Sequence, residues 1–448
     1  MVTTEAATRL DAIPGPAGHR MLGMAPAFRR DLLECLLDGF RDHGDLVAYR
    51  LGPRRGPLGH TAVAAYHPDD VHQVFTNTAH FGRRTIGFGV LTEMIGTGLL
   101  TSEGDAWLRQ RRTLQPLFTP RRVGRYAELM GAEAAQLLAE PGTGSGEVID
   151  LHQFARRYAV RVLGRSLFGE EVDEVLPDLY QLVPYGADLV RARTFQPIRL
   201  PLAWPTPHNR KMTALRAAMY GLVDRILAKR VGRAEVDAAD DDLVTRLRAA
   251  RDPETGAALS NQEIRDQLLV FLLAGQETTS GALTFTLQKL GRDQALQDRV
   301  AEEAAGDTGA DELARASLRE GMRLYPPAYV NERVTTTETE LAGHRLPPDT
   351  MVLVTPWVTH RHPQYWPEPE RFDPERFLGT SDRPRYAYFP FGGGSRSCIG
   401  EHFAMLEATV LLQAVLARYR ITALDEPSVA PFITLRPRGS VRATLTPR

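Results

Sequence analysis

The sequence predicts a mainly helical α+β protein in which small sheets flank a long helical middle. Three observations predict this class. The stretch from about 105 to 320 is dominated by helical periodicity, residues 44–80 alternate apolar and polar side chains, and the chain after 325 has prolines, short β-like runs and turns. A last helix is expected from about 401 to 418, followed by a β-rich tail.

No repeat, low-complexity linker or internal boundary divides the sequence. We therefore expect a single domain over residues 1–448, in which residues 1–22 form a lead-in that carries prolines and glycines. The only run of glycines, at 392–394, lies in a cysteine loop described below. Since no phosphate-binding glycine motif for a nucleotide is found, no fused reductase domain is expected.

Composition narrows the class of protein. A hydrophobic share of 43% and a charged share of 24% are ordinary for a globular chain with a sizeable core. The net charge of −1 gives no general attraction to nucleic acid or to an anionic membrane, so neither is expected as a partner. All but three of the 54 basic residues are arginine, which indicates GC-rich coding and a bacterial, actinobacterial source.

Cysteine usage and hydropathy bear on the compartment. The two cysteines, Cys35 and Cys398, cannot form a disulfide framework in so long a chain, which favours a reducing compartment. No apolar run of about 18 residues is found, so neither a membrane-spanning helix nor a signal peptide is expected. The sequence therefore predicts a cytoplasmic protein.

The longest predicted helix carries residues that do not suit a core. Ser260 and Glu263 have the spacing of a capping box, and the apolar run 268–274 that follows must be buried on most faces. Residues 275–279 then read Gly-Gln-Glu-Thr-Thr. A carboxylate and two hydroxyls in the middle of a core helix are locally unfavourable, which marks the segment as a candidate functional site.

A second candidate site surrounds the later cysteine. The segment from Phe389 reads Phe-Pro-Phe-Gly-Gly-Gly-Ser-Arg-Ser-Cys-Ile-Gly. Its glycines allow backbone conformations closed to other residues and would let a flat group approach the main chain. Cys398 is expected to begin a helix, whose N–H groups and dipole favour the thiolate that binds metals. A structural cysteine in a glycine turn is the alternative for a cysteine taken alone.

The positions of Phe391, Gly394, Arg396, Cys398 and Gly400 resemble the haem-binding signature of the cytochrome P-450 superfamily, F-x-x-G-x-R-x-C-x-G. The resemblance implies the cytochrome P-450 fold, with haem b (iron protoporphyrin IX) between the long central helix and the cysteine-loop helix. It also implies Cys398 as the ligand of the iron. Further haem contacts are implied for Phe391, Gly392, Gly400 and Ala274.

Three other segments resemble the same family, in the family's order. Ala274 to Thr279 is similar to its oxygen-activation motif, which implies Thr278 as the alcohol beside bound dioxygen and Glu277 as the acid of the proton path. The alternative for Thr278 is a hydrogen bond back to its own helix. Glu320 and Arg323 resemble the E-x-x-R pair, and Arg376 would complete a structural ion cluster with them.

The last resemblance concerns arginines. Trp107 and Arg111 match the family's W-x-x-x-R, which implies contacts with haem propionates. The same role is implied for Arg333 and Arg396. A core position is the alternative for Trp107, and the neighbouring arginines at 109 and 112 could instead help to dock an acidic electron carrier.

The resemblance implies a monooxygenase that inserts one oxygen atom from O2 into a hydrophobic small molecule of secondary metabolism, with a terpenoid or polyketide favoured. Electrons would come from a separate ferredoxin or flavodoxin with its reductase. A fatty-acid hydroxylase, in which one of the arginines at 191, 193 and 199 holds the acid, and a peroxide-driven haem-thiolate enzyme are alternatives, as is a non-catalytic haem sensor. The implied substrate pocket is apolar and comprises Phe88, Leu189, Phe271, Ala274, Thr278, Ala328, Tyr329, Val330, Phe432 and Ile433.

Overall fold

The fold is mainly helical with small sheets, as predicted. The computed structural model describes residues 8–52, 60–169, 176–194, 196, 199–229, 242–306 and 311–448. The chain divides into two compact units. Unit 1 comprises Met1–Thr85, Met322–Phe372 and Gly379–Cys398, and unit 2 comprises Ile86–Gly321, Asp373–Leu378 and Ile399–Arg448.

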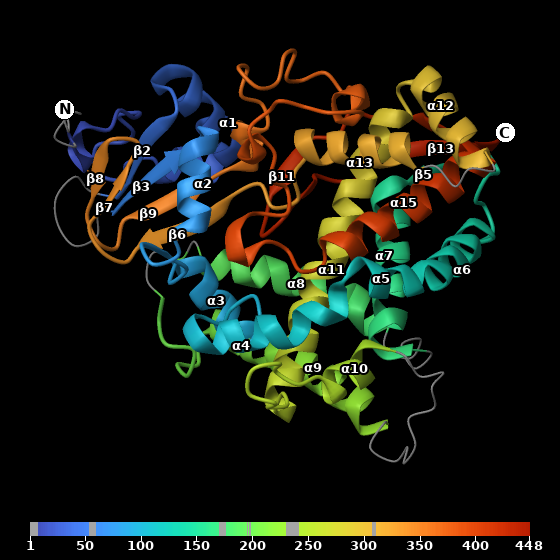
Figure 1. Ribbon diagram of the computed structural model, residues 1–448, viewed down its shortest axis with the longest axis horizontal. Coiled ribbons are helices and arrows are strands. Elements are labelled where there is room, and N and C mark those ends of the chain that lie inside the picture. The colour runs from blue at the N-terminus through green and yellow to red at the C-terminus, as the bar shows by residue number, and fades with distance from the viewer. Residues whose placement is uncertain are drawn as a thin grey trace. The chain divides into compact units, whose positions relative to one another are not determined.

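Unit 1 is built on a mixed five-stranded sheet with the order β2-β3-β9-β6-β4 (Figure 1). Its strands are β2 (Leu46–Leu51), β3 (His60–Ala65), β9 (Met351–Val354), β6 (Asn331–Thr335) and β4 (Phe81–Gly82). The alternation in residues 44–80, which favours a small antiparallel sheet, coincides with β2 and β3; these two strands pair antiparallel, with Leu46 opposite Ala65, but the sheet as a whole is mixed. The parallel partner β9 comes from far along the chain, where no local pattern could reveal the pairing.

Unit 1 also contains a second sheet, helices and short 3-10 turns. The second sheet has the order β1-β8-β7. The elements are β1 (Thr8–Arg9), α1 (Ala25–His43), α2 (Pro68–Thr76), β7 (Thr339–Leu341), β8 (His344–Leu346) and α14 (Pro356–Thr359), with short 3-10 turns at Leu10–Ala12, Arg385–Ala387 and Gly394–Arg396.

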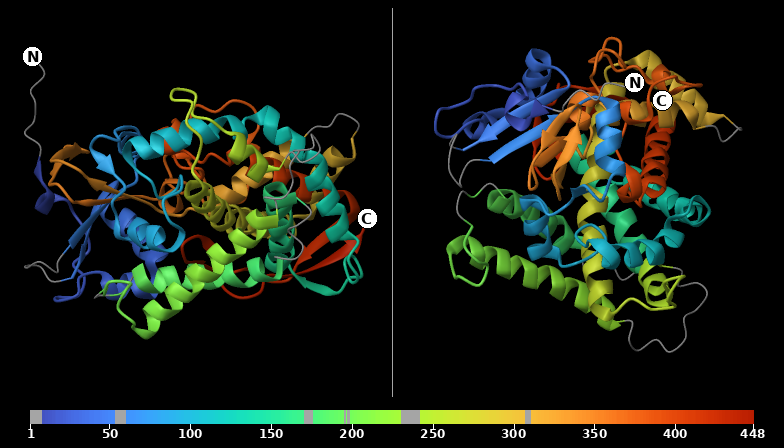
Figure 2. Two further views of the ribbon diagram at one scale, coloured as in Figure 1. Left: turned by 90° about the horizontal axis from the view of Figure 1, so that it is seen from below. Right: turned by 60° about the vertical axis from the view of Figure 1, so that its left-hand side comes forward.

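Unit 2 is organised around α11 (Asn261–Leu290), the long helix that is prominent in the right-hand view of Figure 2. It packs against α7, α9 and α15. The other helices are α3 (Ile86–Ile95), α4 (Gly104–Leu114), α5 (Pro120–Val123), α6 (Ala127–Leu138), α7 (Leu151–Phe168), α8 (Leu176–Thr194), α9 (Pro207–Lys229), α10 (Leu243–Ala249), α12 (Gln294–Ala305), α13 (Glu312–Leu324, of which the last three residues belong to unit 1) and α15 (Glu401–Arg418), with 3-10 turns at Gln115–Phe118, Gly124–Tyr126 and Pro374–Phe377.

The predicted capping box begins α11. The Ser260 hydroxyl accepts a hydrogen bond from the Glu263 N–H (3.2 Å), and the Glu263 carboxylate accepts one from the Ser260 N–H (2.8 Å). The buried hydroxyls of Thr284 and Thr286 donate to carbonyls one turn earlier, which satisfies them inside the core. Among the described residues α11 alone has the length and hydropathy to cross a membrane, and 83% of its most apolar window is buried within the protein.

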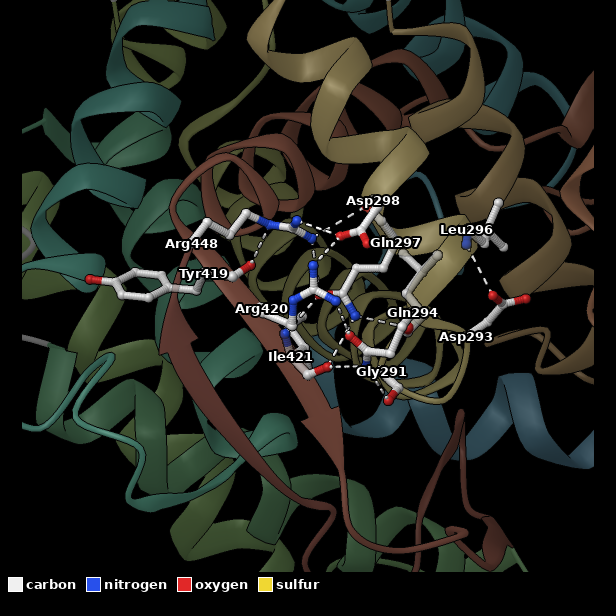
Figure 3. Close-up of polar contacts among 11 residues, drawn as sticks. Gly291, Asp293, Gln294, Leu296, Gln297, Asp298, Tyr419, Arg420, Ile421 and Arg448 are labelled. Carbon is white, nitrogen blue, oxygen red and sulfur yellow. Dashed lines mark hydrogen bonds and ion pairs between the residues drawn. The ribbon is translucent and has the colours of Figure 1, made fainter.

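The C-terminal strands are tied to α12 (Figure 3). β10 (Tyr419–Ala423), β13 (Arg442–Pro447) and β5 (Val148–Asp150) form one sheet, and β11 (Val429–Pro431) and β12 (Leu435–Pro437) form a separate hairpin. Asp298 of α12 accepts hydrogen bonds from Arg420 (2.7 Å) and Arg448 (2.5 Å). We call these three residues the C-terminal clasp.

Candidate active site

The cysteine loop of unit 1 is closed by its own backbone. The Cys398 N–H donates to the carbonyl of Phe391 (2.9 Å), and the Gly394 N–H donates to the Tyr386 hydroxyl (3.1 Å). Cys398 is exposed, whereas Phe391 and Arg396 are half-buried. The loop therefore has a fixed conformation that leaves its cysteine accessible to a ligand.

The glycines of the loop serve packing as well as conformation. Gly392 and Gly394 have φ of 72° and 65°, in the left-handed region that favours glycine. A Cβ on Gly394 would lie 2.2 Å from the Phe75 carbonyl oxygen, and one on Gly393 would lie 2.3 Å from the Tyr386 ring. The space beside Gly393 and Gly394 is therefore filled by other groups of the protein. The sequence had led us to expect that the glycines let a flat ligand approach the main chain. Only Gly392, whose Cβ would have its nearest neighbour at 4.0 Å, leaves space beside the loop.

One prediction about Cys398 is wrong in detail. The cysteine does not begin a helix, because α15 starts at Glu401 and its N-cap is Gly400. Ile399 and Gly400 form a turn that separates the thiol from the first helical residue. The helix itself spans the residues that the sequence predicted, and the cysteine lies just before its N-terminus.

Arg333 is a buried cation in unit 1. It donates to the carbonyl of Glu332 (2.9 Å) and lies over the Phe75 ring, 5.2 Å from its centroid. Burial, and then the nearby Arg396 guanidinium, lowers the pKa of Arg333 to about 10. No ion pair between Arg333 and a carboxylate occurs in the described part of the chain. Since an uncompensated buried charge is costly, this environment fits an anionic group supplied by a ligand.

The other arginine candidates lie on α4 in unit 2. Arg111 and Trp107 are half-buried, and Trp107 packs against the main hydrophobic core of the unit. Arg109 pairs with Glu263, and Arg112 pairs with Asp252 (3.1 Å). These ion pairs explain the neighbouring arginines as structural groups, which weakens the expectation that they dock an electron carrier.

The middle of α11 has one open face. Ala274 is exposed and Thr278, one turn later, is half-buried, although the helix around them is mostly buried. The Thr278 hydroxyl donates to the Ala274 carbonyl (2.8 Å), which is the back-bond named above as the alternative. A hydroxyl donor in this bond still has lone pairs that can accept a hydrogen bond from a ligand or water.

Glu277 is buried within a cluster of polar side chains from three elements. Its carboxylate accepts a hydrogen bond from the Thr434 hydroxyl (3.0 Å) and lies 3.4 Å from Arg436, which also donates to Asp188 (2.8 Å). We call these four residues the acid cluster. Burial raises the pKa of Glu277, while Arg436, Thr434 and Arg156 act in the opposite direction.

Sequence reasoning missed Glu407 on α15. Its side chain is buried, and burial raises its pKa well above the ordinary value, while the nearby Thr279 side chain acts in the opposite direction. The available signal was a carboxylate inside the otherwise apolar run Phe403–Leu406 and Ala408. Arg436 and Thr434 were missed as well, and a β-rich tail offers no pattern that would connect them to α11.

The pocket candidates fall in both units. Leu189 and Phe271 belong to the core cluster of unit 2, and Ile433 packs against it. Phe88, Ala274, Thr278 and Phe432 also lie in unit 2, whereas Ala328, Tyr329 and Val330 lie in unit 1. Of the arginines considered as fatty-acid ligands, Arg193 is buried and paired with Glu93 (2.6 Å), and Arg191 lies over the Phe432 ring.

The residues of the expected structural cluster are all buried or nearly so, and Glu320 pairs with Arg376 as the expectation requires. Arg323 is buried and donates to the carbonyls of His360 (2.9 Å), Pro369 (2.6 Å) and Arg371 (3.0 Å). Glu320 is 3.5 Å from Arg376 and accepts a hydrogen bond from the Asp373 N–H (2.9 Å). The near-duplicate Arg371 pairs instead with Glu368.

Residues 13–442 match the protein family described as Cytochrome P450. The chain is 33% identical over 421 residues to cyclooctat-9-en-7-ol 5-monooxygenase of Streptomyces melanosporofaciens, covering 91% of this chain and 88% of that protein. It is 34% identical over 407 residues to pentalenene oxygenase of Streptomyces avermitilis, covering 87% of each. The crystal structure of the cytochrome P450DA heme domain is similar with a TM-score of 0.84 and 25% identity, covering 97% of this chain and 98% of that one.

Proposed function

Because the chain belongs to the cytochrome P450 family, it is a haem-dependent monooxygenase, and we propose that it inserts one oxygen atom from O2 into a terpenoid. The observation that carries the proposal is that two bacterial relatives, each about one third identical, are named for oxygenation of such compounds. The apolar character of the pocket candidates supports it, since hydrophobic side chains offer contact area to a hydrocarbon skeleton. A role in secondary metabolism follows from the same relatives.

We assign the residues that hold the cofactor, haem b, from their environment. Cys398 is exposed in a rigid loop and would bind the iron as a thiolate, and the buried Arg333 with Arg396 would hold the propionates. Arg111 and Trp107 of α4 would contribute to the same group. Phe391, Gly392, Gly400 and Ala274 would line it. When bound, the haem supplies the activation of dioxygen.

The protein's own part in the reaction is the handling of protons and water. We propose that Thr278 uses its free lone pairs to hold a water or the oxygen substrate, and that Glu277 delivers protons from the acid cluster. Thr278→Ala should consume electrons at a similar rate but release peroxide in place of product. Unchanged coupling in this variant would remove Thr278 from the mechanism.

The first test is the spectrum of the reduced protein with carbon monoxide. A Soret band shifted far to the red is expected if a thiolate binds the iron, and Cys398→Ala should abolish it. Cys35→Ala, which alters the half-buried cysteine of α1, is the matched control and should retain the band. A band typical of imidazole ligation in the unaltered protein would contradict the assignment of Cys398.

The substrate class is tested by binding spectra. Cyclic terpene hydrocarbons and alcohols should shift the spectrum of the ferric protein, whereas long-chain fatty acids should not. The reason is that two of the three arginines considered for the acid are already engaged, because Arg193 is paired with Glu93 and Arg191 lies over an aromatic ring. A response to fatty acids alone would reverse the proposal and favour the hydroxylation of fatty acids.

We further propose that the electrons come from a separate ferredoxin or flavodoxin with its reductase, and that the protein works in the cytoplasm. Product formation should require O2 and such a donor. Turnover with hydrogen peroxide at the same rate, in the absence of both, would support the peroxide-driven alternative. The single-domain organisation over residues 1–448 stays a prediction.

A further inference from the structure

The acid cluster lies directly beside the proposed pocket in sequence. In three elements, a pocket candidate is the chain neighbour of a member of the cluster: Leu189 beside Asp188 on α8, Thr278 beside Glu277 on α11, and Ile433 beside Thr434 in the β11–β12 hairpin. A displacement of any of these elements by a ligand therefore also moves a group that contacts Glu277 or Arg436.

The β11–β12 hairpin supplies both side chains, Thr434 and Arg436, that contact the Glu277 carboxylate. Its turn is closed by a hydrogen bond from the Phe432 N–H to the Thr434 carbonyl (3.1 Å), and the Arg436 guanidinium lies 3.5 Å from the centre of the Phe432 ring. The hairpin also lies close against α11 one turn after Glu277. There, a Cβ on Gly281 would lie 3.3 Å from the Leu435 carbonyl oxygen.

The two terminal nitrogens of the Arg436 guanidinium contact carboxylates that differ in their exposure to solvent. Its partner on α8, Asp188, has a side chain 53% exposed, whereas its partner Glu277 has a side chain 10% exposed. The solvated partner can exchange Arg436 for water at little cost, but the buried partner cannot. A small movement of the hairpin would therefore change mainly the environment of Glu277.

We propose that Arg436, with Thr434, is a positioning residue that controls proton delivery by Glu277, and that contact of substrate with the hairpin tip adjusts this control. The proposal rests on the proposed function of Glu277 as the proton donor. In the donating step the carboxylic acid of Glu277 gives up its proton and becomes a carboxylate. That carboxylate is stabilised by the Arg436 guanidinium and the Thr434 hydroxyl until solvent returns a proton.

The charged groups that face Glu277 determine the sign of the expected effect. Arg436 of β12 and Arg156 of α7 favour the carboxylate, while Asp188 of α8 favours the neutral acid. Removing Arg436 should therefore raise the pKa of Glu277 further. If protonated Glu277 is required for delivery, the alkaline limb of the pH profile should move to higher pH.

The central experiment compares Arg436→Gln with the loss of another arginine that pairs with a different carboxylate of α8. Arg225 of α9 pairs with Asp178 of α8 at 2.6 Å, and both side chains are exposed. Arg436→Gln should lower the coupling of electron use to product by about tenfold and move the alkaline limb upward, as expected for a perturbed general acid. Arg225→Gln should change neither, and Arg436→Lys should restore most of the coupling.

A second readout does not depend on turnover. The carboxyl band of Glu277, identified by its absence in Glu277→Gln, can be titrated by infrared spectroscopy of the ferric holoenzyme. Its midpoint should move to higher pH in Arg436→Gln. An unchanged midpoint and an unchanged alkaline limb would show that Arg436 has only a structural role and would overturn the proposal.

Two further variants protect the test against misfolding of Arg436→Gln. Thr434→Val removes one hydrogen bond without a change of charge and should move the midpoint in the same direction by less. Gly281→Ala shifts the hairpin without touching the acid cluster and should alter coupling, with the carbon monoxide spectrum intact. If the unaltered protein lacks the thiolate band, the proposed function fails. If the band is present but none of the variants moves the midpoint of the Glu277 titration, only the proposed control of Glu277 by Arg436 and Thr434 fails.

Discussion

Two arginine–carboxylate clusters in unit 2 have similar chemistry and opposite consequences for protonation. In the C-terminal clasp, Asp298 accepts hydrogen bonds from two arginines at the surface, and the bond with Arg448 lowers its pKa (Figure 3). In the acid cluster, burial outweighs the nearby arginines and raises the pKa of Glu277. The comparison teaches that access to solvent, and not the identity of the partner, decides whether such a carboxylate remains charged or can act as a proton donor.

The largest expected effect is on the free energy of unfolding, where a buried ion pair is compared with an exposed one. Arg376→Ala should lower the free energy of unfolding by about 3–5 kcal/mol, because it removes one partner of a buried ion pair with Glu320. Arg371→Ala, which breaks an exposed pair with Glu368, should cost about 0–1 kcal/mol and serves as the control. Denaturant unfolding with retention of haem measures both. Equal costs for the two variants would contradict the distinction between buried and exposed pairs.

The next largest effect separates the two clusters by activity. Glu277→Gln should reduce the rate of coupled product formation by about 100-fold, since it removes a general acid while keeping the size of the side chain. Asp298→Asn should leave this rate unchanged because its carboxylate only ties α12 to the C-terminal strands. Product yield per electron consumed is the measurement. A comparable loss in both variants would show that the effect is structural.

The third prediction uses pH. A raised pKa means that the folded state binds the Glu277 proton more tightly than the unfolded chain. Its contribution to stability is therefore fully present below the ordinary value of 4.5 and is lost as the pH rises through the folded pKa. Asp298 has a lowered pKa, so its contribution is present above the ordinary value of 3.8 and is lost as the pH falls.

These opposite signs can be read from melting temperatures. The Tm of the unaltered protein minus the Tm of Glu277→Gln should decrease as the pH increases. The Tm of the unaltered protein minus the Tm of Asp298→Asn should decrease as the pH decreases. Slopes of the same sign would mean that burial does not dominate at Glu277.

The smallest effect is expected at the exposed clasp. Arg420→Gln should lower the free energy of unfolding by at most about 1 kcal/mol, because Arg448 still pairs with Asp298 and surface ion pairs contribute little. High salt should reduce this difference further. A cost as large as that of Arg376→Ala would show that the clasp is a coupled network.

Local signals in the sequence predicted much of the fold. The capping box at Ser260 and Glu263 located the start of α11, and the alternation in residues 44–80 located β2 and β3. Both signals depend on neighbours within a few residues, which is why they can be read without a structure. The same reasoning erred at Cys398, because the propensity of a glycine turn does not define which residue begins the following helix.

The candidate site was predicted only where a motif was continuous in the chain. Cys398, Glu277 and Thr278 lie in such motifs, so the sequence alone was enough to name them as candidates. Glu407 and Arg436 were not, because each acquires its role from a partner on another element: Thr279 for Glu407, and Glu277 for Arg436. Pairings between distant segments have no local signature.

The sequence by itself determined the family, the helical class and the candidate residues of the cysteine loop and of α11. Only the tertiary structure decided which carboxylates are buried, which arginines are already paired, and which hairpin reaches Glu277. The physical reason is that the identity of a side chain sets which proton it can carry, whereas its pKa depends on solvent and on charges brought close by folding.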